Sequence, residues 1–289
     1  MALEQDERSG PRVGNRSSRI LGGSGGARSA AIAAVSTLVV FGVLVVVVVN
    51  APNWPEVKEQ FFNWGVFKNS FPDIAEAFKT NVKLFLIAEV FILFLALFLA
   101  VMRSLPGPVF FPLRVLSTAY TDVFRGIPTI LLVYLLGFGI PGLQLHGVPN
   151  SQVFWAAVAL VLVYSAYVAE VYRAGIDSIH PSQDAAARSL GLSRWQSLRF
   201  VVIPQAIRRV IPPLLNDFIG LQKDTALVAF VVAVPEAFKQ GQIYQSGDFN
   251  FTPLLGVALC FLVITVPLTR TTDWLVARQR RRRQAGGAI

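Results

Sequence analysis

Five charged or amide side chains lie inside otherwise apolar segments, and they are the residues of this sequence best suited to bind a polar ligand: Arg125, Glu170, Asn216, Lys223 and Asp224. An ionisable group in such a segment normally faces protein or a water-filled cavity, and it often marks the path of a substrate or ion. The same groups could instead pair among themselves, Lys223 with Asp224 or Glu170, and Arg125 with Asp122. The pattern therefore indicates either a binding site or structural ion pairs.

Catalytic and metal chemistry find no support in the sequence. His146 and His180 lie far apart in loop segments, and the single Cys260 sits in an apolar run. The apolar runs contain no HExxH or paired-aspartate motif, and the chain has no Gly-x-x-x-x-Gly-Lys-Ser/Thr phosphate loop. We expect no catalytic residue, no metal site and no ATPase activity in this chain.

The elements that position the five polar residues are long apolar segments. Of the 289 residues 54% are apolar and 15% charged, against about 25% charged in soluble domains. Segments of about 20 apolar residues can cross a hydrocarbon core about 30 Å thick. The sequence predicts an all-α, polytopic membrane helical bundle with six spans, at about 30–49, 80–102, within 115–140, 153–172, 212–234 and 251–268.

Arginine-rich segments alternate with these spans and fall on one side, as the positive-inside bias requires. Both ends are therefore predicted to be cytoplasmic, with a disordered basic tail at 1–29 and a second basic tail at 273–289. This placement accounts for the net charge of +9 without nucleic acid as a partner. Residues 51–78, with two tryptophans and mixed charges, are expected to form an external interfacial segment.

The first apolar segment, 30–50, has two interpretations. A signal peptide has an apolar core of about 7–15 residues followed by a small-residue cleavage site. This run is longer and leads into Asn50-Ala51-Pro52-Asn53-Trp54. An uncleaved transmembrane helix is the favoured interpretation.

The cytoplasmic segment 176–206 is predicted to form two short helices joined by a sharp corner. Pro181 and Ser182 suit a helix start. Gly191 stands where a left-handed residue ends a helix. The run Ser193-Arg194-Trp195-Gln196 has capping-box spacing, and the second helix is expected to end at Ile203, before Pro204. A compact, preorganised loop of this kind suits docking to another protein, although a solvated amphipathic loop is the simpler alternative.

Residues 75–270 resemble the permease subunit of the polar amino acid ABC importers, the histidine/glutamine/glutamate type. Five pieces in order carry the resemblance: the apolar run from Thr80, Tyr120 with Arg125-Gly126-Ile127-Pro128, Ala166 to Arg173, Gln183 to Gly191 with Val201 to Ala206, and Asn216 to Leu227.

The resemblance implies a five-helix permease core over 79–272, preceded by one extra transmembrane helix, in the plasma or inner membrane. It implies three kinds of partner: a second permease subunit, identical or homologous, two ATP-binding cassette ATPase subunits, and an extracytoplasmic amino acid-binding protein. ATP is then used by the ATPases, and this chain binds no cofactor. Coupling to the ATPases would fall to Ser182, Gln183, Asp184, Ala185, Ala186, Ala187, Gly191 and Pro204.

The sequence departs from the family's loop at one acidic position. That position, aligned on Gly191, is Ala185, and the nearest carboxylate is Asp184. Because one residue of shift turns a helical side chain by about 100°, Asp184 is expected on another face. We expect the partner permease to carry the stronger coupling loop, in a heteromeric pair.

As intramembrane polar groups, the five polar residues are the candidates for substrate contact: Arg125 for a carboxylate and Glu170 for the ammonium group, with Asn216, Lys223 and Asp224 beside them. Glutamate is the expected substrate, by analogy with importers whose permeases have an extra leading helix. A secondary transporter or channel is the alternative, and it would need no ATPase.

Overall fold

The protein is described by a computed structural model that covers residues 26–231 and 236–286. Within these ranges the chain is helical, with turns between helices and no strand, which confirms the predicted all-α class. The chain divides into two compact units between Lys58 and Glu59. Most of the expected disordered tail, residues 1–25, lies outside the described residues, as do residues 287–289.

The first unit contains α1 (Gly26–Val49) and most of α2 (Trp54–Phe61). With 24 residues, α1 is about 36 Å long, enough to cross a bilayer. Its side chains from Arg28 onward are exposed, as in a helix that faces lipid. The hydroxyls of Ser36 and Thr37 donate to the Ala33 carbonyl, so these polar groups are satisfied within the helix itself.

The second unit begins with α3, which runs unbroken from Trp64 to Ser104. The Asn63 side chain caps it by accepting from the Val66 amide at 3.0 Å. The second span was expected to begin at about residue 80, and the helix that contains it begins 16 residues earlier. Residues 64–78 of the expected interfacial segment are the first turns of the same helix, because the Asn63 cap starts it early and Pro72 does not interrupt it.

The expected third span is two helical segments bent by 100°. The first is α4 (Phe111–Gly126). The second consists of α5 (Thr129–Tyr134), a π-helical turn over 135–139 and α6 (Ile140–Gly142). The break falls at Ile127 and Pro128, where proline lacks the amide needed to continue the helix.

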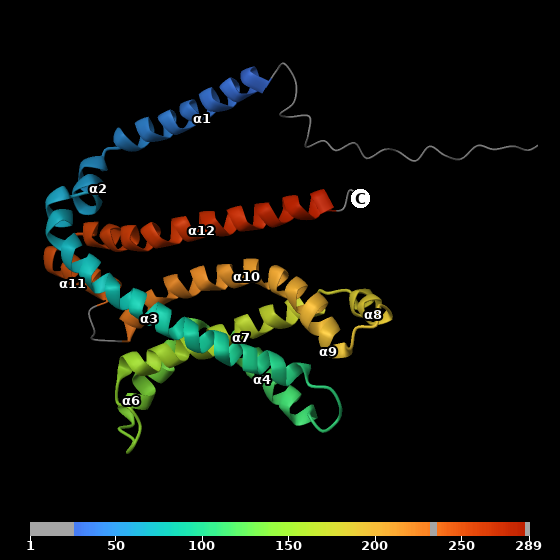
Figure 1. Ribbon diagram of the computed structural model, residues 1–289. Helices are drawn as coiled ribbons and strands as arrows, with labels where there is room; N and C mark the ends of the chain where they lie inside the picture. The colour runs from blue at the N-terminus through green and yellow to red at the C-terminus, as the bar shows by residue number, and fades with distance from the viewer. Residues whose placement is uncertain (1–25, 232–235, 287–289) are drawn as a thin grey trace, which may run out of the picture. The chain divides into compact units, whose positions relative to one another are not determined.

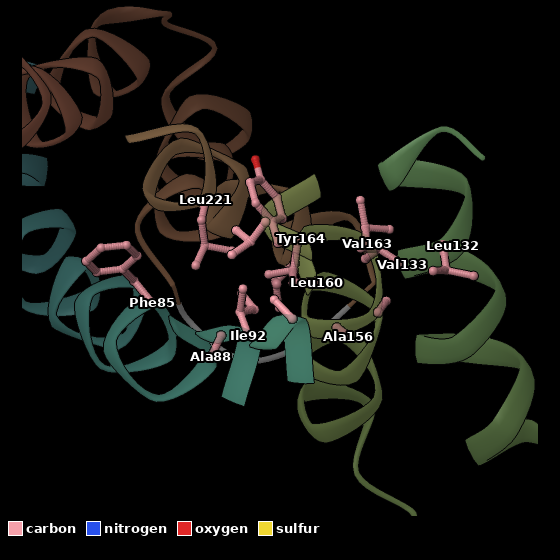
Figure 2. Packing of buried hydrophobic residues seen from close by; sticks show 14 of the residues in the cluster. Phe85, Ala88, Ile92, Leu132, Val133, Ala156, Leu160, Val163, Tyr164 and Leu221 are labelled. Carbon is pink, nitrogen blue, oxygen red and sulfur yellow. The ribbon is translucent and has the colours of Figure 1, made fainter. Parts of the chain in front are cut away.

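The core of the second unit is centred on α7 (Gln152–Asp177), which packs against α3, α4, α5 and α10. Figure 2 shows Leu160 and Val163 of α7 between Ile92 of α3 and the α5 residues Leu132 and Val133. Ala156, Ala159, Ala166 and Ala169 are all buried on α7. Small residues let helices approach closely, which is how membrane helices gain packing contacts without a hydrophobic driving force between them.

The cytoplasmic segment forms α8 (Pro181–Ser189) and α9 (Arg194–Ser197), and a π-helical turn over 198–202 leads directly into α10 (Ile203–Asp224). The expected helix end at Ile203 is therefore wrong. Pro204 follows the π-helical turn, in which the Ile203 amide bonds to the Leu198 carbonyl, so the regular helical bonding is already shifted where the proline amide is missing.

The remaining helices complete the second unit. A 3-10 segment over 225–230 follows α10, and α11 (Ala237–Asp248) and α12 (Thr252–Gly286) come after it. Among the described residues α1, α3, α7 and α12 are apolar and long enough to span a membrane, which gives four spans, or five if the bent pair crosses as one, against the six expected. Of the expected fifth span, 212–234, residues up to 224 belong to α10 and residues 225–230 to the 3-10 segment, while 232–234 lie outside the described residues. Figure 1 shows α8 and α9 at the opposite end of the second unit from α11.

Candidate functional site: a coupling loop and a membrane charge cluster

The predicted corner of the loop is confirmed by its backbone. Gly191 has φ +89°, in the left-handed region. The Gly191 amide donates to the Arg188 carbonyl at 3.0 Å and the Leu192 amide to the Ala187 carbonyl at 3.3 Å. These two bonds form the Schellman end of a helix, which favours glycine. The corner therefore depends on a backbone conformation that a side chain at residue 191 would strain.

Both helix starts in the loop are capped as the sequence indicates. Pro181 occupies the first turn of α8, and the His180 ring accepts from the Ser182 amide at 3.2 Å. In α9 the Gln196 amide donates to Ser193 Oγ at 3.3 Å, and the Ser193 amide donates to Gln196 Oε1 at 2.8 Å. This reciprocal pair is a capping box, which fixes where α9 begins.

The loop is tied to the helices that follow and precede it. Ser197 Oγ donates to Asp184 Oδ1 at 2.6 Å, joining α8 to α9. Gln205 Nε2 donates to Gln183 Oε1 at 3.3 Å, and the Arg209 guanidinium donates to the Ser178 carbonyl. These contacts were not predictable from sequence spacing, because they join residues 13 to 31 positions apart. Asp184 faces its own loop, whereas Ala185 and Ala186 are exposed.

Where the loop meets the membrane helices, α7 and α10 are in close contact at Gly175. A Cβ on Gly175 would lie 2.0 Å from Val210 Cγ2, a distance that requires the Val210 side chain or one of the helices to move. Gly175 is buried, and Val210 is also buried in the core. The loop is therefore joined at both ends to membrane helices that are tightly packed against each other.

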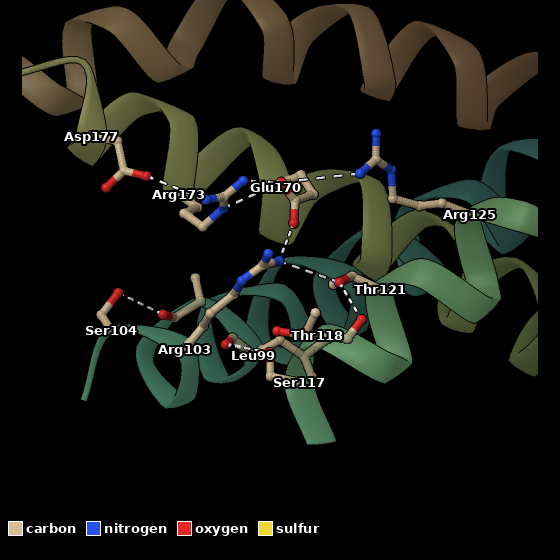
Figure 3. Close-up of polar contacts among 11 residues, drawn as sticks. Leu99, Arg103, Ser104, Ser117, Thr118, Thr121, Arg125, Glu170, Arg173 and Asp177 are labelled. Atoms are coloured by element: carbon tan, nitrogen blue, oxygen red, sulfur yellow. Dashed lines mark hydrogen bonds and ion pairs between the residues drawn. The ribbon is translucent and has the colours of Figure 1, made fainter. Parts of the chain in front are cut away.

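The structure brings the predicted residues Arg125 and Glu170 close together, and two further arginines join them. Glu170 accepts hydrogen bonds from Arg103 and from Arg173, the latter at 2.9 Å, while Arg125 Nη1 lies 4.0 Å from Glu170 Oε2. Figure 3 shows the three guanidinium groups approaching Glu170 from different directions. Thr121 and Asp177 complete what we call the Glu170 cluster. No ion pair joins Arg125 to Asp122 within the residues that the structure describes.

Arg103 and Arg173 were not among the predicted site residues. A signal for them was present, since each directly follows a predicted span, 80–102 or 153–172, and Glu170 lies near the end of the second of these. The cluster combines three guanidinium groups with the two carboxylates of Glu170 and Asp177. Arg125 is the least engaged of the three, with 42% of its side chain exposed and its guanidinium 5.6 Å from the Tyr167 ring centre.

The other predicted membrane residues lie along α10 and do not join this cluster. Asp224 Oδ2 accepts from the Tyr164 hydroxyl at 2.9 Å. Asn216 is exposed, and Lys223 forms no ion pair in the described part of the chain. One carboxylate oxygen of the nearby Asp217 is buried with no hydrogen-bond partner among the described residues.

An all-helical apolar core with a compact, capped loop at one end and a charge cluster beside it suits a membrane transport subunit. Residues 107–282 match the family described as "Binding-protein-dependent transport system inner membrane component", and the chain belongs to that family. It is 35% identical over 205 residues to the probable amino-acid permease protein YxeN of Bacillus subtilis, covering 71% of this chain and 90% of that one.

Two further comparisons agree with this assignment. The probable glutamine ABC transporter permease protein GlnM of Bacillus subtilis is 38% identical over 181 residues, covering 62% of this chain and 80% of the relative. A crystal structure of an amino acid ABC transporter with histidines superposes with a TM-score of 0.67 at 28% identity, covering 75% of this chain and 98% of that one. The chain is an amino acid ABC transporter permease, a non-catalytic membrane component.

Proposed function

We propose that this chain is the permease subunit of an ATP-driven importer for a polar amino acid of the glutamine and glutamate class. The observation that carries the proposal is the coupling loop, whose Gly191 corner and internal hydrogen bonds give a rigid docking element continuous with α10. Two ATPase subunits dock on this loop and on that of a second permease subunit, and an external binding protein delivers the substrate. Closure of the ATPases then moves the loops, and the membrane helices alternate their access.

The substrate assignment rests on the membrane charges and on the relatives. Arg125 is assigned to the substrate carboxylate, because its guanidinium is exposed and only loosely held at 4.0 Å from Glu170. Asn216 and Lys223 are further contacts. Glu170 and Asp224 already have partners, so either must exchange one to bind an ammonium group. The relative named for glutamine favours glutamine beside the glutamate expected from the sequence.

Uptake of labelled amino acids by cells lacking this chain tests the proposal. We expect uptake of glutamine or glutamate to fall and to return when the intact chain is restored, while leucine uptake stays unchanged. Unchanged uptake of every polar amino acid would overturn the proposed function.

The topology is tested separately. The arginine-rich segments support cytoplasmic positions for both ends. Single cysteines placed near the two ends, in a Cys260→Ser background, should resist a membrane-impermeant thiol reagent in intact cells and react after lysis. Labelling of either end from outside would contradict the proposed orientation.

A further inference from the structure

The carboxylate nearest to the family's acidic loop position is turned into the loop rather than toward a docking partner. Asp184 is half-buried, and its Oδ1 atom accepts from Ser197 Oγ at 2.6 Å. The Ser197 side chain is fully buried, so its hydroxyl has no competing water. A hydrogen bond to an ionised acceptor in such a place is about twice as strong as a neutral one.

We propose that Asp184 is a positioning residue, an internal clamp that locks α8 to α9 so that the coupling loop moves as one body with α10. This inference rests on the proposed function. It differs from an anchoring role, in which the carboxylate would contact the ATPase directly.

The geometry around the clamp supports a transmitting role. Ser197 is the last residue of α9 and continues through the π-helical turn into α10. Gln183, the residue before Asp184, is bonded to Gln205 of α10. A push on α8 therefore reaches α10 through two side-chain bonds as well as through the Gly191 corner. Without the clamp, α8 would be free to pivot at that corner.

The position of Ala185 shows why a clamp replaces an anchor here. Ala185 and Ala186 are exposed while Ala187 is buried. The outward part of α8 thus presents small side chains, and its only carboxylate is directed inward at Ser197. The loop can dock by close fit, and its stiffness comes from the Asp184–Ser197 bond.

The test compares four variants of the complete transporter, reconstituted in vesicles with its ATPase and permease partners: Asp184→Ala, Asp184→Asn, Ser197→Ala and the double alanine variant. The measured quantity is amino acid transported per ATP hydrolysed. Ser189→Ala is the matched control, because the Ser189 hydroxyl is exposed and bonds only to the Ala186 carbonyl of its own helix.

If the clamp is correct, Asp184→Ala and Ser197→Ala each lower this ratio on the order of tenfold, as expected for loss of one charge-assisted bond. The double variant should be no worse than either single one. Asp184→Asn should restore most of the coupling, because its amide oxygen still accepts from Ser197. In every variant the ATPase subunits should remain bound.

Three results would overturn the clamp: an asparagine variant as poor as alanine, an inert Ser197→Ala, or rescue of Asp184→Ala by Ala185→Glu. Each would indicate a charge that contacts the ATPase. Failure of the unmodified complex to transport any polar amino acid would instead refute the proposed function, so the two failures are distinguishable.

Discussion

The two ends of the membrane core are held together by different chemistry. At the coupling-loop end, the Glu170 cluster joins α3, α4 and α7 through partly exposed charges (Figure 3). At the α11 end, Asn81 donates to Glu236 Oε2 at 2.8 Å and to Thr225 Oγ1 at 3.3 Å, and accepts from the Ala237 amide at 3.0 Å. All the side chains of this Asn81 network are nearly inaccessible, with Asn81 only 1% exposed.

The difference concerns how easily each end can rearrange. In the Asn81 network both the side-chain oxygen and the side-chain nitrogen of Asn81 have hydrogen-bond partners. Moving any member would leave a buried polar group without a partner, which costs free energy of folding. In the Glu170 cluster three guanidinium groups surround one carboxylate, and one of them is 4.0 Å away. Three nearby donors give this carboxylate alternative partners if the helices move. We therefore expect the α11 end to act as the fixed end and the coupling-loop end as the moving one.

The largest effect on stability is expected from Asn81→Leu. The substitution removes three hydrogen bonds and leaves the Glu236 carboxylate and the Ala237 amide buried with fewer partners. Loss of bonds to a buried charged group predicts a destabilisation of roughly 3 kcal/mol. Thermal unfolding of the purified protein in detergent measures it, with the exposed Glu76→Gln as the control. A melting temperature equal to that of the unmodified protein would show that the α11 end is not the fixed one.

A smaller loss of stability and a larger loss of transport are expected from Glu170→Gln. The amide keeps an acceptor for one guanidinium group but removes the charge that three of them share. We expect about 1–2 kcal/mol of destabilisation, together with at least tenfold slower uptake. Asp177→Asn is the control in the same cluster, because Asp177 is mostly exposed and should change stability by less than about 0.5 kcal/mol. Equal transport by the two variants would contradict a special role for Glu170.

Much of this comparison was accessible from the sequence, and the reasons are local. The Gly191 corner, the capping box from Ser193 and the proximity of Arg125 to Glu170 each follow from backbone preference, residue spacing or family motif. The Asn81 network was not predictable. Asn81 is more than 140 residues away from Thr225 and from Glu236, and nothing in the sequence around these residues distinguishes them from ordinary helix or loop residues.

The wrong helix end at Ile203 and the unexpected length of α3 have different origins. Sequence rules treat proline as a break, but a π-helical turn precedes Pro204 and the helix continues into α10. The tryptophans and mixed charges of 51–78 indicate an interfacial segment, and they do not reveal that residues 64–78 continue directly into the apolar part of α3. The Asp184–Ser197 bond is a third case, since the 100° rotation predicted a different face for Asp184 but could not name its partner.

The Arg125→Gln variant tests whether Arg125 binds substrate or only stabilises the Glu170 cluster. At 4.0 Å from Glu170, and with much of its side chain exposed, Arg125 should contribute less than about 0.5 kcal/mol to stability. If it binds the substrate carboxylate, uptake should fall at least tenfold while the melting temperature stays constant. Measured uptake close to that of the unmodified chain would remove Arg125 from the substrate path and leave it as a spare ion-pair partner.

The smallest expected effect is the pH dependence that Glu236 gives to the α11 end. Glu236 lies in the connection between α10 and α12, outside the spanning helices, and burial raises the pKa of its carboxyl, opposed by the hydrogen bond from Asn81. A carboxyl whose pKa is raised on folding stabilises the protein most below its unfolded pKa. That contribution is lost as the pH rises through the folded value. We therefore expect a modest loss of stability as the pH increases above the ordinary glutamate range.

Glu236→Gln should remove this dependence. Glutamine carries no titrating charge, but its single side-chain oxygen can accept from only one of the Lys239 amide and the Asn81 amide group. The variant is therefore expected to lose one buried hydrogen bond while its stability no longer varies with pH through this residue. Melting temperatures of both proteins between pH 4 and pH 8 test this, and their difference cancels the titration of every other group. A difference that stays constant over this range would mean that the Glu236 carboxylate is as well stabilised inside as in water. The α11 end would then be held by charge in the same way as the coupling-loop end.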